Sequence, residues 1–164
     1  MLAISTATAL WFLPFAVPVC IWVAWSDLSS MKIPNKAVVA LLAVFVVIGI
    51  VALPLTEYLW RYAHFVVILI FGFVLAQAGI GAGDAKFAAA MAPFIDRTDA
   101  ISLLSLFAAV LLAAFATHRI FRAIPAIRRA FPDWKSWTHK KFPMGFALGG
   151  TLILYLIAGV ALGS

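Results

Sequence analysis

Two aspartates of this sequence, Asp27 and Asp84, stand at the ends of apolar runs. One run ends at Trp25, just before Asp27, and another begins at Ala85, directly after Asp84. Carboxylates at a membrane boundary are costly because burial removes water from their charge, so they are candidates for function. Two carboxylates brought together repel each other, which raises the pKa of one of them, and the pair shares a proton near neutral pH. Such a pair can activate water with one carboxylate and protonate a peptide carbonyl with the other.

A glycine-rich stretch leads into the second aspartate. The segment AGIGAGDAKF, residues 78–87, places Gly79, Gly81 and Gly83 just before Asp84. Backbone at membrane depth leaves helical geometry only where it is buried in protein or lines a wet cavity. Glycine there lets an extended chain approach without side chains in the way. The alternative is that these small residues serve helix packing, and the four residues GAGD alone do not decide between the two.

The composition is that of an integral membrane protein. Of the 164 residues, 66% are hydrophobic and only 11% are charged, whereas a soluble domain has about a quarter of charged residues. The mean hydropathy is +1.12. We interpret the net charge of +6 as a signal of orientation in the membrane, and expect no nucleic-acid partner. No Lys or Arg precedes Lys32, so we expect the first apolar segment to be retained and not cleaved as a signal peptide.

Metal and disulfide chemistry have little support in the sequence. Cys20 is the only cysteine, so an internal disulfide and a four-cysteine zinc site are both excluded. The histidines His64, His118 and His139 lack the spacing of known metal ligands. Positions at the membrane–water interface are the better interpretation. We therefore expect no metal and no cofactor.

Six apolar runs indicate an all-α bundle of six transmembrane helices that forms one domain over residues 1–164. The runs are approximately 3–25, 37–55, 63–78, 85–95, 100–117 and 142–162. Most approach the ~20 residues that a spanning helix needs, but the fourth is short. Aromatic belts at the two interfaces are expected from Trp22 and Trp25 at one end, and from Tyr58, Trp60 and Tyr62 at the other.

Basic residues are distributed unevenly among the connections between these runs. If the fourth run crosses, all lysines and arginines except Arg61 and Arg97 fall on one side. The loops on that side span about residues 26–36, 79–86 and 118–141. Because basic loops face the cytoplasm, we expect the N-terminus outside and both Asp27 and Asp84 at the cytoplasmic boundary. The longest loop mixes basic residues with Ile, Phe and Trp, which suits contact with anionic membrane lipids.

Three stretches together resemble one family of membrane enzymes. SDLSSMKIPN contains Asp27, GIGAGDAKF contains Asp84, and KFPMGFALGG contains Pro143 and Gly145. In this order, in a small six-helix protein, they resemble the prepilin peptidases (type IV leader peptidases), which are membrane aspartyl proteases with a GxGD signature. The short form, without a large cytoplasmic insertion, is similar to the tight-adherence (Flp-type) pilus branch. Many relatives have Pro-Tyr-Gly where this chain has Met144 in the middle position, so the chain lacks the phenolic hydroxyl there but keeps the backbone turn.

The resemblance implies an activity and a substrate. It implies that Asp27 and Asp84 are the catalytic dyad of an aspartic-type endopeptidase in the bacterial inner membrane, with its active site at the cytoplasmic side. The implied substrate is a prepilin or pseudopilin precursor, cut after a glycine between a basic cytoplasmic leader and a hydrophobic helix. Bifunctional members carry paired Cys-x-x-Cys motifs and also methylate the new N-terminus. Because Cys20 stands alone, we expect proteolysis without methylation.

Further residues are expected to bind substrate or support the dyad, namely Gly81, Gly83, Lys86, Pro34, Asn35, Pro143 and Gly145. Lys86 is expected either to tune Asp84 or to meet an acidic group of the substrate, with snorkelling to lipid headgroups as the alternative. Pro34 suits the first turn of the second helix, and Asn35 suits hydrogen bonding to nearby backbone. Gly145 is expected to permit close packing beside the site.

A second function is compatible with the same carboxylates. A small proton- or cation-coupled transporter component also uses broken helices and buried acids. Both acids are expected at one membrane face, whereas alternating access favours a site near the midplane. A catalytically silent assembly partner is a third possibility, which the intact pair of aspartates makes less attractive.

Overall fold

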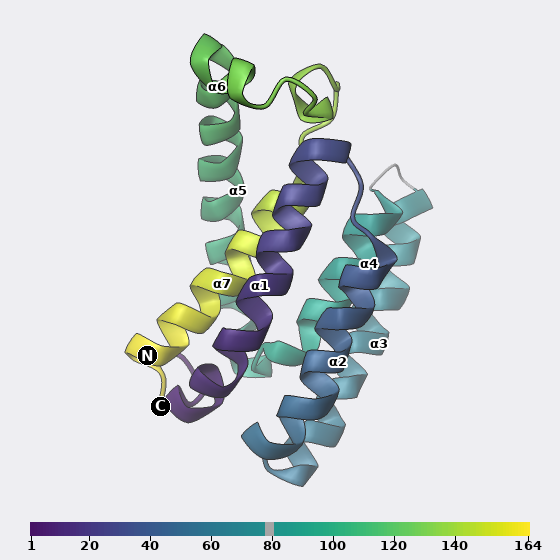
Figure 1. Cartoon of the computed structure of the whole chain (residues 1–164). Coiled ribbons are helices and arrows are strands. Elements are labelled where there is room, and N and C mark those ends of the chain that lie inside the picture. Colours follow the sequence, from purple (N-terminus) through teal and green to yellow (C-terminus); the bar gives the residue numbers. More distant parts are fainter. Residues whose placement is uncertain (78–80) are drawn as a thin grey trace.

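The computed structural model describes residues 1–77 and 81–164, and their regular structure is helical. The helices are α1 (Thr6–Ser30), α2 (Asn35–Ala52), α3 (Leu55–Gln77), α4 (Ala82–Met91), α5 (Ala100–Ala123), α6 (Pro125–Ala130) and α7 (Met144–Leu162). Short 3-10 turns are η1 (Ala92–Phe94), η2 (Arg97–Asp99) and η3 (Lys135–Trp137). Figure 1 shows α1 and α7 side by side, α2, α3 and α4 as a second group, and α5 with α6 at its end.

Five stretches within the described residues are long and apolar enough to cross a membrane. They are α1, α2, α3, α7 and the stretch from Arg97 through α5 to Ala123. The predicted all-helical, multi-pass membrane protein is therefore confirmed. The helix α4 has 10 residues and is about 15 Å long, roughly half of a ~30 Å hydrocarbon core. A sixth crossing stays a prediction.

The helices continue into the segments that the sequence indicates as loops. The helix α1 runs on to Ser30 and ends where Met31, with φ 56°, donates its N–H to the Asp27 carbonyl at 2.9 Å. The helix α5 continues through His118 to Ala123. Of the glycine-rich stretch, residues 78–80, including Gly79, lie outside the described residues, and Gly81 directly precedes α4. Asp27 and Asp84 are thus both helical residues.

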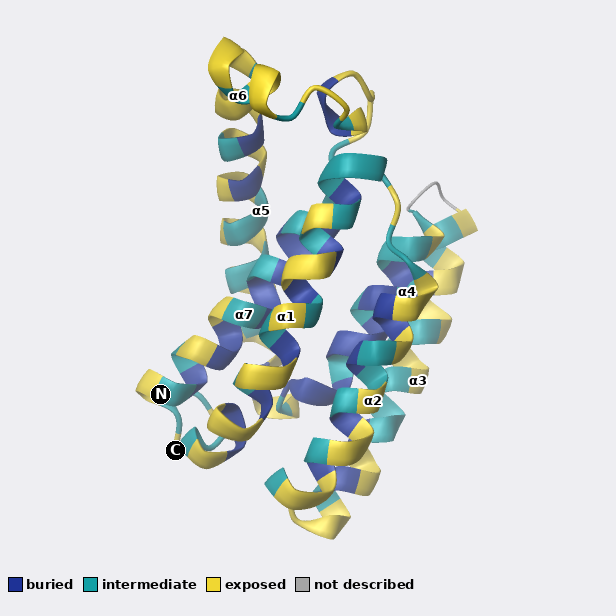
Figure 2. Ribbon diagram, in the orientation of Figure 1, coloured by how far each residue is buried: buried dark blue, intermediate teal, exposed yellow. Residues whose placement is uncertain are grey.

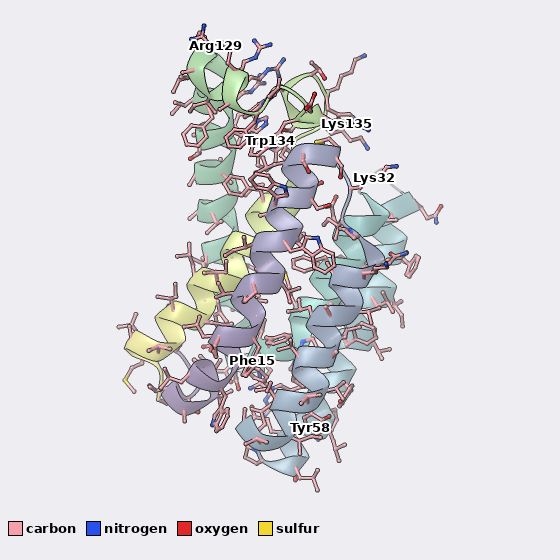
Figure 3. All side chains as sticks on the ribbon, in the orientation of Figure 1. Phe15, Lys32, Tyr58, Arg129, Trp134 and Lys135 are labelled. Carbon is pink, nitrogen blue, oxygen red and sulfur yellow. The ribbon has the colours of Figure 1, made fainter. Side chains whose placement is uncertain are left out.

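The two ends of the bundle differ in charge. Figure 3 shows Lys32, Arg129 and Lys135 at one end, and Tyr58 towards the other. The chain termini lie together away from the basic end (Figure 1), where the N–H of Leu2 donates to the carbonyl of Leu162 at 3.0 Å. The connection between α5 and α7 lies at the basic end, and its short helix α6 has no buried residue (Figure 2). This polarity is what the uneven distribution of basic residues predicts.

Close helix packing and aromatic side chains form the core. The helices α1 and α7 approach so closely that a Cβ at Gly149 would lie 2.8 Å from the carbonyl oxygen of Cys20. Phe45 stacks on Tyr58 with ring centroids 5.5 Å apart. Tyr58 is buried, and its hydroxyl donates to the carbonyl of Val46 at 3.0 Å. The prediction that Tyr58 is an interface anchor is therefore wrong, because its ring packs against α2.

A buried polar cluster ties the elements together at the end opposite the basic loops. The Asp99 carboxylate accepts the N–H groups of Ala3 at 2.8 Å and Ile4 at 3.0 Å, and the hydroxyl of Tyr155 at 2.8 Å. Nearby, the guanidinium of Arg61 contacts the carboxylates of Glu57 and Asp96. Buried charges are tolerated where they are paired and hydrogen-bonded in this way. The cluster holds the start of the chain against α3, α5 and α7.

Candidate active site

Asp27 lies in the last turn of α1 and is bound by the first turn of α7. Its carboxylate is buried, and Oδ2 accepts the N–H of Gly145 at 2.6 Å. Pro143 is the N-cap of α7, so Gly145 lies in the first turn, where backbone N–H groups have no acceptor within their own helix. The positive end of a helix dipole also favours a negative charge. The carboxylate of Asp27 therefore caps α7.

Gly145 leaves little room beside Asp27. A Cβ at this position would lie 3.0 Å from the Cβ of Asp27, 3.1 Å from its Oδ2 and 3.0 Å from Cδ1 of Ile33. These separations are shorter than ordinary van der Waals contacts. A glycine is thus what allows the start of α7 to approach the carboxylate closely enough for the hydrogen bond.

Asp84 lies in the first turn of α4 and faces the same cavity as Asp27. The cavity has a volume of about 720 Å³, and both aspartates line it. The pKa of Asp84 is raised from its ordinary value of 3.8 to about 6. Burial is the largest cause, the negative charge of Asp27 adds to it, and the positive charge of Lys141 opposes it. The structure therefore brings the two predicted aspartates to one chamber, where their charges interact.

Gly81 and Gly83, the glycines before Asp84 that the structure describes, have different surroundings. Gly81 is the N-cap of α4, and a Cβ added there would collide with Oδ2 of Asp84. A Cβ at Gly83 would lie 3.4 Å from the Cβ of Ile33, which is near the limit of ordinary contact. The absence of a side chain at Gly81 leaves the space that the Asp84 carboxylate occupies.

The start of α2 forms another part of the chamber wall. Pro34 is the N-cap of α2, and its carbonyl accepts the N–H of Ala37 at 3.0 Å. Asn35 follows as the first helical residue, and its Oδ1 accepts a hydrogen bond of 3.4 Å from Nζ of Lys86. Both Asn35 and Lys86 line the cavity. The ammonium of Lys86 thus reaches across the chamber from α4 to α2.

Two of the chamber residues that were not predicted from the sequence lie just before α7. His139 and Lys141 line the cavity beside the aspartates, and the N–H of Lys141 donates to Nδ1 of His139 at 3.1 Å. They follow a basic, aromatic segment that suggests a lipid-facing surface. Their position two to four residues before Pro143 was the one feature of the sequence that could have indicated a place near the site. His118, in contrast, is buried against Trp137 with ring centroids 5.3 Å apart.

The arrangement suits hydrolysis by a pair of carboxylates. The Asp27 carboxylate accepts the backbone N–H of Gly145 at 2.6 Å, and the pKa of Asp84 is raised to about 6, which favours the protonated form of Asp84. The chamber that both aspartates line has a volume of about 720 Å³, which is within the range of ligand-binding cavities. A base and an acid acting on one carbonyl group are the requirement for adding water to a peptide bond.

Comparison with known proteins agrees with the motifs. A family model described as the type IV leader peptidase family matches residues 14–118. The matched range contains Asp27 and Asp84 and ends before Pro143 and Gly145. No curated protein and no solved structure matches the chain. The resemblance to the leader peptidases, predicted from the three motifs, is confirmed.

Proposed function

Because the chain belongs to the type IV leader peptidase family, we propose that it is an aspartic-type endopeptidase that removes the leader peptide of prepilin-like precursors. The family indicates a protease that acts on a protein precursor. The aspartic catalytic type is supported by the observation that Asp27 and Asp84 line one cavity. The proposed supporting residues are Pro34, Asn35, Gly81, Gly83, Lys86, Pro143 and Gly145.

In the proposed reaction the two aspartates exchange roles as base and acid. Asp27 takes a proton from water while the water oxygen bonds to the scissile carbonyl carbon, and Asp84 gives its proton to the carbonyl oxygen. Asp27 then protonates the amide nitrogen, Asp84 takes a proton back from one hydroxyl, and the carbon–nitrogen bond breaks. The products are a leader with a new carboxyl group and a mature chain with a new amino group. Both aspartates return to their starting states.

We place this chemistry at the cytoplasmic face of the bacterial inner membrane. Support comes from the basic residues at the end of the bundle where α4 begins, since basic loops face the cytoplasm. Residues 85–95 are then a short fourth crossing, the N-terminus is outside, and residues 1–164 form one transmembrane domain. The exposed basic segment of residues 118–141 then contacts anionic lipids.

The finer details of the substrate follow from the same resemblance. We propose a precursor of the tight-adherence (Flp-type) pilus, cut after a glycine that precedes its hydrophobic helix. No methylation of the new N-terminus is expected, since Cys20 is the sole cysteine.

Co-expression with a candidate Flp-type precursor tests the proposal. We expect the wild-type chain to remove the leader, as seen by a gel shift and by N-terminal sequencing of the product. Asp27→Asn and Asp84→Asn are each expected to abolish cleavage while the protein stays folded in the membrane. Asp133→Asn, at an exposed position, is the matched control and should cleave normally. Complete cleavage by either Asp27→Asn or Asp84→Asn would refute the dyad.

A further inference from the structure

A second cavity, with apolar walls, begins at Asp84. It has a volume of about 340 Å³ and lies along α4, between residues of α3, α5 and α7. Asp84 and Met144 line both this cavity and the polar chamber. Among the described residues that line it, Thr151 is the one polar residue besides Asp84, and its hydroxyl donates to the carbonyl of Ala147 at 2.8 Å. We call this cavity the α4 groove.

The α4 groove extends from one end of α4 to beyond the other. Asp84 and Ala85 line its beginning, and Ile95, which follows η1, lines its far end. This length corresponds to more than about 15 Å along the helix axis. Phe71 of α3 and Leu104 of α5 line the groove and are 58% and 66% exposed. The groove is therefore accessible from the lipid-facing side of the bundle.

Small residues line the groove along α3 and α4. Gly72, Ala85 and Ala88 are among them. A Cβ at Gly72 would lie 3.0 Å from the Cβ of Ala85, so α3 and α4 pack closely against each other and form one wall of the groove. In membranes, small residues allow another helix to approach the backbone closely, and the packing stabilises the pair. The groove thus has the surface that an apolar helix needs, and the catalytic carboxylate lies at its end.

We propose that the α4 groove binds the hydrophobic helix that follows the cleavage point of the precursor, an inference that rests on the proposed function. A chain whose scissile bond lies between Asp27 and Asp84 must direct the following apolar residues into the membrane. The groove is an apolar surface continuous with Asp84 in that direction. A helix about 10 Å wide and 15 Å long has a volume on the order of 1,000 Å³, so one face inserts into the groove and the opposite face stays in lipid.

Site-specific photo-crosslinking tests this docking site directly. Benzoylphenylalanine is introduced at Leu104 or, as the control, at Val47 of α2, which is also exposed (62%) but does not line the groove. Both proteins carry Asp84→Asn so that the bound precursor stays intact. We expect light-dependent crosslinks from position 104 to the hydrophobic helix of the precursor, located by mass spectrometry, and few from position 47. Equal crosslinking from both positions, or crosslinks from position 104 to lipid alone, would overturn the docking site.

The cleavage assay separates failure of this inference from failure of the proposed function. If the wild-type chain does not cleave the precursor, the proposed function fails. If it cleaves the precursor but position 104 gives no crosslink to the helix, the docking site alone fails.

Narrowing the groove provides a second test. Ala88→Leu is expected to lower kcat/KM at least tenfold for a precursor with its hydrophobic helix, and to change little for a soluble peptide that ends soon after the cut. Ala113→Leu, at an exposed position of α5 outside the groove, is the matched control. Unchanged processing of the full precursor by a folded Ala88→Leu protein would contradict the proposal, as would an equal loss for both substrates.

Discussion

The N–H of Gly145 donates a 2.6 Å hydrogen bond to Oδ2 of Asp27 and so joins the first turn of α7 to the last turn of α1. A methyl group at position 145 would lie 3.1 Å from the same oxygen. Gly145→Ala should therefore displace the carboxylate or break its hydrogen bond. Hydrogen bonds to charged groups contribute about 1.5–3 kcal/mol, so we expect kcat/KM for leader removal to fall roughly tenfold to a hundredfold. Gly150→Ala on the same helix is the control, since its nearest neighbour would be Val110 at 3.4 Å; equal activity of the two variants would contradict the prediction.

The glycines before Asp84 are expected to differ in their sensitivity to substitution. Gly81→Ala places a methyl group against the Asp84 carboxylate, which must rotate away. Because a side chain moves and not the backbone, we expect cleavage to fall at least tenfold while thermal stability in detergent changes little. Gly83→Ala makes a near-ordinary contact of 3.4 Å with Ile33 and should keep most of the activity. A Gly83→Ala protein that loses more activity than Gly81→Ala would show that the steric explanation is wrong.

The central pair of residues could be predicted from the sequence, but the groups around it could not. Asp27 and Asp84 are conspicuous because acidic residues are rare in the chain, and these two adjoin apolar runs on the side where the basic residues gather. The hydrogen bond from Gly145 comes from a backbone N–H, so the residue types in the sequence do not indicate it. Lys141 has the same appearance as its basic neighbours, and only the tertiary structure brings it to the cavity.

Helix boundaries show the same limit. Apolar runs predicted the class of fold because a membrane span must be apolar. The apolar runs end before the helices do, because the hydrogen bonds of a helix backbone can continue through polar residues. Asp27 and His118 are accordingly helical. The cluster around Asp99 was missed because nothing in its local sequence indicates that Ala3, Ile4 and Tyr155 converge on it.

Lys141 should control the pH dependence of cleavage. The proposed mechanism needs the protonated form of Asp84, whose pKa is raised to about 6 by burial and by Asp27. We therefore expect kcat/KM to fall as the pH rises above about 6. Since the charge of Lys141 lowers this pKa, Lys141→Gln should move the fall to higher pH. Lys135→Gln, which does not line the chamber, is the control, and an identical shift in both variants would indicate a general effect of charge.

The same carboxyl group should make stability depend on pH. The pKa of Asp84 is 3.8 in ordinary surroundings and about 6 in the folded protein, so the folded state holds the proton more tightly. The stability contributed by this group is therefore present below about pH 4 and is lost as the pH rises to about 6. Asn is neutral at every pH. We expect Asp84→Asn to have a higher Tm than the wild type at pH 8 and a similar Tm at pH 4, measured in detergent, with Asp133→Asn as the control that shows no such difference.

The cluster around Asp99 should matter for stability and not for chemistry. The hydroxyl of Tyr155 donates to Asp99 at 2.8 Å and accepts the N–H of Asp96 at 3.1 Å. Tyr155→Phe removes one of the hydrogen bonds that the Asp99 carboxylate accepts and takes away the acceptor of the Asp96 N–H. Leaving a buried donor unsatisfied costs about 1–3 kcal/mol. We expect a lower Tm in detergent but, at temperatures where the variant is folded, a kcat/KM within about twofold of the wild type, since the cluster lies at the end of the bundle away from Asp27 and Asp84. A folded Tyr155→Phe protein with normal Tm but strongly reduced cleavage would instead show that the two ends of the bundle are coupled.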